Sequence, residues 1–153
     1  MRSYLLGLIL VLVAWPVSLF SRPGSAALAD VANRRNEFNR LLADEWEYEM
    51  RESPEFATIV GDYRYNDRWS DNSLAHVPQQ RADLQSWLSR FDSIHTEGFP
   101  EQETLSQVLM VRNLKERIEA IDLKTFEMPI DQFFGAHLQI AQFVSYAPFN
   151  TTT

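Results

Sequence analysis

The chain has 153 residues, of which 45% are hydrophobic and 23% charged, with a formal net charge of −7 and no cysteine. This length is sufficient for one domain. The lack of cysteine excludes disulfides, thiolate nucleophiles and cysteine-ligated zinc or iron–sulfur clusters. The acidic balance argues against a nucleic-acid partner, whose phosphates would repel such a surface.

The first 29 residues have the pattern of a secretory signal peptide. Arg2 provides a positive start, and an almost unbroken apolar stretch without charge runs from residue 4 to residue 20. Ala27 and Ala29 then form an A-x-A pattern, which predicts cleavage before Asp30, with a cut after Ala27 or an uncleaved anchor as the alternatives. We therefore predict export to the periplasm or the extracellular space, a mature helical domain over residues 30–153, and no stable membrane span after cleavage.

The region after residue 30 is typical of an all-α fold, because apolar residues recur at spacings of three and four between proline and glycine breaks. A first helix is predicted over 33–52, and a short helix over 54–60 that ends at Gly61. The predicted buried stripe of the first helix consists of Phe38, Leu41, Leu42, Trp46 and Met50.

The segment 62–73 has no helical period and is rich in Asp, Asn and Ser. Such a composition predicts a loop. Because three exposed aromatic rings in one short segment are costly, we predict an ordered loop in which Tyr63, Tyr65 and Trp69 are buried.

Two further helices and an apolar tail complete the chain. One helix is predicted from residue 74, or from Pro78, to about residue 95, with a buried stripe of Leu84, Trp87, Leu88, Phe91 and Ile94. The next is predicted over 100–122, with a buried face of Leu105, Val108, Leu109, Val111, Leu114, Ile118 and Ile121. The tail over 128–149 has only one charged side chain, Asp131, so we expect it either to pack on these helices or to be covered by further polypeptide.

The motif search predicts no catalytic, cofactor-binding or metal-binding residue in this chain. His76, His95 and His137 are far apart in the sequence, and none lies in the HExxH pattern of a zinc hydrolase. We interpret all three as surface or helix-cap residues. Glu45 and Glu49 lie one turn apart, which predicts an exposed charged face more strongly than a catalytic dyad.

The acids of the predicted loop invite a calcium interpretation. Asp62, Asp67 and Asp71 supply oxygen ligands, but the spacing lacks the glycine and the terminal glutamate of an EF-hand loop. We therefore predict a solvated loop whose Asp and Asn side chains bond to their own backbone.

Two stretches of the sequence form a composite motif. The earlier stretch contributes Ser53, Pro54, Glu55, Ala57, Thr58, Gly61, Asp62, Arg64, Tyr65, Asp67, Arg68, Trp69, Ser70 and Asp71. The later segment "MPIDQFFGAHLQI" contributes Pro129, Asp131, Gly135 and His137. With these residues, the sequence from residue 36 to residue 149 resembles a bacterial exported family catalogued as domain of unknown function 885.

The resemblance implies a larger, mostly helical protein similar to zinc metallopeptidases of the carboxypeptidase type, with an HExxH motif further downstream. By this resemblance, the chain is a truncated N-terminal part whose partner is the missing C-terminal portion of its own domain. Zinc and peptide substrates then belong to the full-length protein, and this part alone is inactive. A minor hypothesis gives Asp67 or Arg68 a place in a substrate cleft. The alternative is a complete, non-catalytic periplasmic module for binding or scaffolding.

Overall fold

The computed structural model describes residues 23–128 and 135–147. All regular secondary structure in these two ranges is helical, which confirms the predicted all-α fold. The α-helices are α1 (Pro23–Glu52), α2 (Pro54–Ile59), α3 (Val77–Asp92), α4 (Glu101–Asp122) and α5 (Ala136–Phe143), with 3-10 turns η1 (Tyr63–Tyr65) and η2 (Thr125–Glu127).

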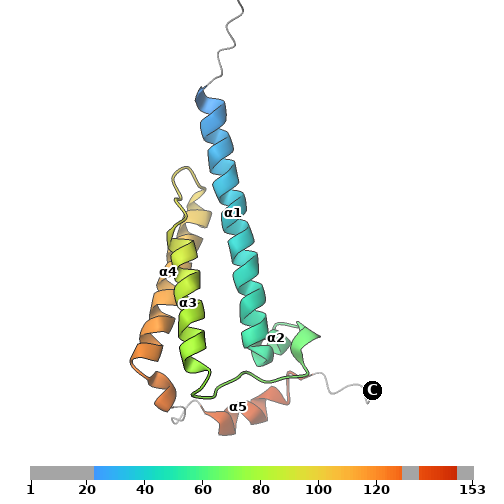
Figure 1. Ribbon diagram of the computed structural model, residues 1–153. Coiled ribbons are helices and arrows are strands. Elements are labelled where there is room, and N and C mark those ends of the chain that lie inside the picture. Colours follow the sequence, from blue (N-terminus) through green and yellow to red (C-terminus); the bar gives the residue numbers. More distant parts are fainter. Residues whose placement is uncertain (1–22, 129–134, 148–153) are drawn as a thin grey trace, which may run out of the picture.

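The three long helices lie side by side and enclose the core (Figure 1). Helices α3 and α4 form an antiparallel pair, and α1 packs along it. At the centre, the ring of Phe38 meets Phe91 edge-on with centroids 6.2 Å apart, and the ring of Phe99 lies 6.1 Å away. The buried core residues are Phe38, Leu41, Tyr48, Leu84, Trp87, Phe91, Ile94, Val111, Leu114 and Ile118.

The predicted stripe of α3 is confirmed, because Leu84, Trp87, Phe91 and Ile94 are buried and Leu88 packs against them. The helix begins at Val77, with Pro78 in its first turn, rather than at residue 74. Proline is favourable there because the first turn needs no backbone donor.

Helix α1 begins at Pro23, ten residues before the start that was predicted at residue 33. Most of this added segment is exposed, and the first fully buried side chain of α1 is Phe38. Further along the helix, Arg35 donates to Glu103 of α4 at 2.7 Å through Nε. The apolar pattern missed the first turns because they carry no buried stripe.

Two expectations about burial were wrong at apolar positions of α1 and α4. Trp46 is half exposed, and its ring contacts Phe56 of α2 instead of the core. On α4, Leu105, Val108 and Leu109 are 49%, 53% and 53% exposed. At about 100° per residue, Leu105 and Leu109 lie on the side of the helix opposite the buried Val111 face.

The loop 62–73 was predicted to bury its aromatic rings, and this too was wrong. Tyr63 and Trp69 are 54% and 64% exposed, and only Tyr65 is half-buried. Polar contacts hold the loop instead. The hydroxyl of Thr58 donates to the side chain of Asn66 at 2.7 Å, and the backbone N–H of Ser70 donates to Glu55 at 3.1 Å.

Gly61 ends the short helix α2 as the sequence predicted. Its φ of +90° lies in the left-handed region, and a Cβ added there would meet no atom within 4 Å. The backbone conformation alone therefore demands glycine. It lets the N–H groups of Gly61 and Asp62 bond to the carbonyls of Thr58 and Ala57 and turn the chain into η1.

We expect Gly61→Ala to lower the free energy of unfolding by about 1–2 kcal/mol, because an L side chain is strained in the left-handed region. Urea denaturation followed by circular dichroism measures this loss. Gly61→Asn is the control, since asparagine tolerates positive φ better, and it should recover part of the loss. Equal stability of the Ala variant and the unsubstituted chain would contradict this account of the turn.

Candidate functional site

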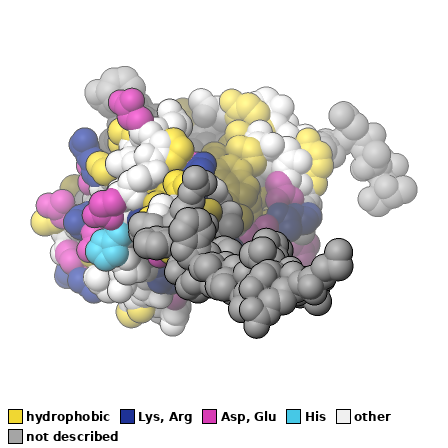
Figure 2. Space-filling model, turned by 90° about the horizontal axis from the view of Figure 1, so that it is seen from above, with side chains coloured by type: hydrophobic (Ala, Val, Ile, Leu, Met, Phe, Trp, Pro, Cys, Tyr) yellow, Lys and Arg dark blue, Asp and Glu magenta, His cyan; other side chains and the backbone are white. Residues whose placement is uncertain are grey.

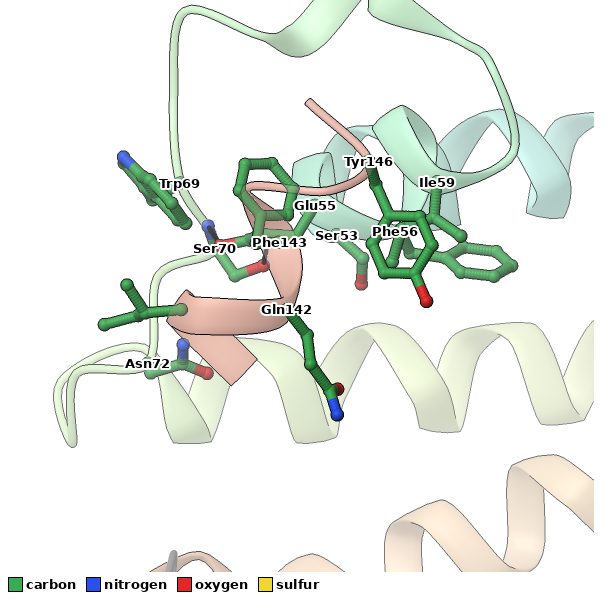
Figure 3. Close-up of a pocket in the computed structure, with 11 residues that line it drawn as sticks. Ser53, Glu55, Phe56, Ile59, Trp69, Ser70, Asn72, Gln142, Phe143 and Tyr146 are labelled. Carbon is green, nitrogen blue, oxygen red and sulfur yellow. Dashed lines mark hydrogen bonds between the residues drawn. The ribbon is translucent and has the colours of Figure 1, made fainter. Parts of the chain in front are cut away.

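An apolar groove of about 640 Å³ lies where α2 and α5 meet the 62–73 loop (Figure 3). These elements are found at one end of the bundle (Figure 1). The two sides of the groove come from segments far apart in the sequence. The ring of Phe143 on α5 packs against Trp69 in the loop, with centroids 5.3 Å apart and planes tilted by 53°. The groove is lined by Ser53, Glu55, Phe56, Ile59, Trp69, Ser70, Asn72, Ile140, Gln142, Phe143 and Tyr146.

A second groove of about 380 Å³ adjoins the first and shares Glu55, Trp69, Ile140 and Phe143 with it. Arg68 lines this smaller groove, whereas Asp67 lines neither. The structure therefore separates the two residues of the cleft hypothesis.

Glu55 is fixed in the middle of the larger groove by Ser70 (Figure 3). One carboxylate oxygen accepts from the Ser70 backbone N–H at 3.1 Å, and the other accepts from the Ser70 hydroxyl. Both residues belong to the motif quoted for the family resemblance, as does Trp69. The motif thus marked one wall of the groove, while Phe56, Ile59 and Tyr146 had no sequence signal beyond their apolar character.

The acidic loop is organised around Arg64. Its guanidinium donates to Asp62 and, through Nη1 and Nη2, to Glu47 of α1 at 2.9 and 2.8 Å. The bonds from Arg64 lower the pKa of both carboxyl groups, and for Glu47 the hydroxyl of Tyr65 adds to the effect. The start of the loop is thus held to α1 by charge pairing at the surface, and of the three rings Tyr65 joins it by donating its hydroxyl to Glu47.

The predicted self-bonding of the loop is confirmed at both of its ends. Asp62 accepts from the backbone N–H of Arg64 at 3.2 Å, and Asp71 accepts from that of Ser73 at 2.9 Å. Asp67 pairs with Arg68 at 3.3 Å. In the described ranges, no three His, Asp or Glu side chains come together in a way that would hold a metal ion.

Glu45 and Glu49 do not form the exposed face that the sequence predicted. Glu45 is only 7% exposed, because α1 turns it toward α4. Arg117 of α4 lies between the two acids, 2.9 Å from Glu49 and 3.8 Å from Glu45. Burial raises the pKa of Glu45, the nearby charge of Glu49 raises it further, and Arg117 partly offsets both effects.

His76 and His95, the two histidines whose side chains the structure describes, do not come together. His76 immediately precedes α3 and lies 3.2 Å from Glu52, and His95 is exposed in the connection between α3 and α4. The side chain of His137 lies outside the part that the structure describes. The backbone carbonyl of His95 accepts from Arg34 of α1, which ties α1 to that connection.

On the face seen in Figure 2, acidic and basic side chains of the described residues are intermingled rather than separated into patches of one sign. Exposed pairs such as Arg81 with Asp122 and Arg112 with Glu116 contribute to this pattern, each at 2.7 Å. No basic stripe is visible on the face in Figure 2.

Comparison with known proteins assigns the chain to a family. Searches of curated proteins and of solved structures found no significant match. A family model matches residues 54–153, which include α2, the acidic loop, α3, α4 and α5. The chain therefore belongs to the family described as Bacterial protein of unknown function (DUF885).

Proposed function

We propose that this chain forms the helical N-terminal part of an exported, zinc-metallopeptidase-like protein and is not catalytic by itself. The family membership supports this proposal, because every residue named for the resemblance except Ser53 falls within the matched region. The metallopeptidase character rests on the resemblance. In this proposal, peptides are the substrates of the full-length protein, and the zinc ligands lie in polypeptide outside these 153 residues.

The observation that carries the proposal is the apolar strip on α4 formed by Leu105, Val108 and Leu109. Three large side chains, each about half exposed, lie on one stretch of a helix whose other side is already packed. Exposed apolar surface of this kind marks an interface. We assign its cover to the later part of the same polypeptide.

Export is the second part of the proposal, and it rests on the leader pattern of the first 29 residues. The apolar stretch over residues 4–20 lies outside the described ranges. Among the helices of residues 23–128 and 135–147, none has the length and apolar character needed to cross a membrane. N-terminal sequencing of the exported protein should give Asp30 as the first residue.

A non-catalytic binding module is the second candidate function, and the groove is the observation that favours it. A volume of about 640 Å³ lies within the range of about 300–1,000 Å³ typical of small-molecule sites. In this alternative, the chain acts without any further catalytic polypeptide.

The first test is to read the codons that follow Thr153. The proposal expects an open reading frame with an HExxH motif, and an immediate stop codon would overturn it.

The second test is binding of a dye that fluoresces on exposed apolar surface. Replacing Leu105 and Leu109 by Ser should lower the fluorescence, whereas replacing the exposed polar residues Asn113 and Glu116 by Ser should not. A monomer that binds no dye and melts cooperatively would favour the binding module.

A further inference from the structure

The groove at α2 and α5 has an unusual combination of open aromatic rings and a single charge. Trp69 and Tyr146 are more than half exposed, and Phe56 is also exposed, although all three line one groove. In Figure 3, Trp69 and Phe143 lie on one side of Glu55, and Phe56 and Tyr146 lie on the other. The faces of aromatic rings attract cations.

The charge of the groove has one sign. Among the described residues that line the larger groove, Glu55 is the only one with a charged side chain. The two bonds from Ser70 hold its carboxylate in place and leave further lone pairs able to accept. A bound cation would therefore find a fixed negative partner.

Arg68 in the adjoining groove does not cancel the negative charge of Glu55, because its guanidinium is already paired with residues outside both grooves. Its guanidinium pairs with Asp67 at 3.3 Å and lies over the ring of Tyr65, 5.2 Å from the centroid. Neither Asp67 nor Tyr65 lines either groove. The sign of the larger groove is thus set by Glu55.

The size of the groove exceeds what a small ion needs. A cavity of about 640 Å³ with mainly apolar walls accommodates a ligand with a hydrophobic body. We propose that this groove binds a small organic cation, an ammonium group on an aromatic or aliphatic stem, with the ammonium at Glu55 and the stem between Trp69, Phe56 and Tyr146. This inference is independent of the peptidase proposal, because it requires no catalytic polypeptide.

The test compares 4-phenylbutylammonium with 4-phenylbutan-1-ol, a neutral molecule of nearly the same length and shape, by calorimetric titration of the full chain. We expect the ammonium to bind about tenfold more tightly than the alcohol, as one charge-assisted contact with cation–π support provides. The indole N–H signal of Trp69 should shift on binding, while that of the buried Trp87 stays in place. Equal affinities for the two molecules would overturn the proposal, and so would no binding of either at millimolar concentration.

Two variants test the named residues. Glu55→Gln keeps partners for Ser70 but removes the charge, so it should bring the two affinities together. Glu101→Gln removes the same charge at the far end of α4 and should leave the tenfold difference intact (Figure 1). A Glu101→Gln effect as large as that of Glu55→Gln would show general attraction to an acidic chain and would contradict the site. If Glu55→Gln does not fold, comparing the affinities of the ammonium and the alcohol for the unsubstituted chain still tests the proposal.

Discussion

Replacing Phe38 by Ala should lower the free energy of unfolding by about 3–5 kcal/mol, the range for removing a fully buried aromatic side chain. Phe38 has no exposed surface and contacts Phe91 of α3 and Phe99 of the connection before α4. The cavity would thus open where all three long helices meet. Since domains of this size are stable by about 5–15 kcal/mol, the variant should be close to unfolded at moderate urea concentrations.

The control for Phe38→Ala is Leu109→Ala, which shortens a large apolar side chain on the exposed side of α4. We expect this variant to stay within about 0.5 kcal/mol of the unsubstituted chain. Urea unfolding curves followed by Trp fluorescence compare both. Similar losses for the two variants would show that the core does not lie between α1 and α3.

Replacing Arg117 by Met should have the second-largest effect, a loss of about 1–3 kcal/mol near neutral pH. Arg117 is the basic partner of Glu45 and Glu49, and Glu45 is buried. Without the guanidinium, the buried carboxylate of Glu45 loses its counter-charge, and Glu49 loses a hydrogen-bond donor. Methionine keeps most of the apolar stem, so the loss reports charge rather than packing.

The pH dependence identifies this mechanism. The pKa of Glu45 is raised in the folded chain, so between its unfolded and folded pKa values the native state binds more protons than the unfolded state. The contribution of Glu45 to stability therefore falls as the pH rises from about 4.5, the ordinary pKa of glutamate, through the folded value. Arg117→Met removes the charge that offsets this shift, so the fall should become steeper and extend to higher pH.

Glu45→Gln provides the control for the Arg117 prediction. This substitution removes the buried charge, so the loss of stability above about pH 4.5 should disappear both in the unsubstituted chain and in the chain that carries Arg117→Met. Thermal melts at about pH 4, below the start of the expected fall, and at about pH 7 provide the comparison. A loss from Arg117→Met that is the same at both pH values would contradict the electrostatic account.

Local patterns in the sequence predicted the positions of the helices well, but they predicted less well which apolar side chains of each helix are buried. Leu84, Trp87 and Phe91 share one face of α3, and a period of about 3.6 residues is enough to reveal this. Leu105 and Leu109 have the same kind of helical spacing on α4, yet they are exposed. Periodicity shows that a helix has an apolar side, but only tertiary packing decides whether that side is covered.

The errors at Glu45 and Tyr63 have the same origin. Glu45 is buried because Arg117 reaches it from α4, and no local window contains both residues. Tyr63 is exposed, and the loop is anchored without its ring, because Arg64 bonds to Glu47 of α1, seventeen residues earlier in the chain. The groove was invisible for a related reason, since its walls come from α2 and α5, about eighty residues apart in the chain.

The exposed start of α1 can be shortened without touching the core. The described helix residues before Val31 contribute no side chain to the core cluster. In the export proposed above, a cut after Ala29 would therefore shorten α1 at its solvent-facing end and leave the packing of the three long helices in place.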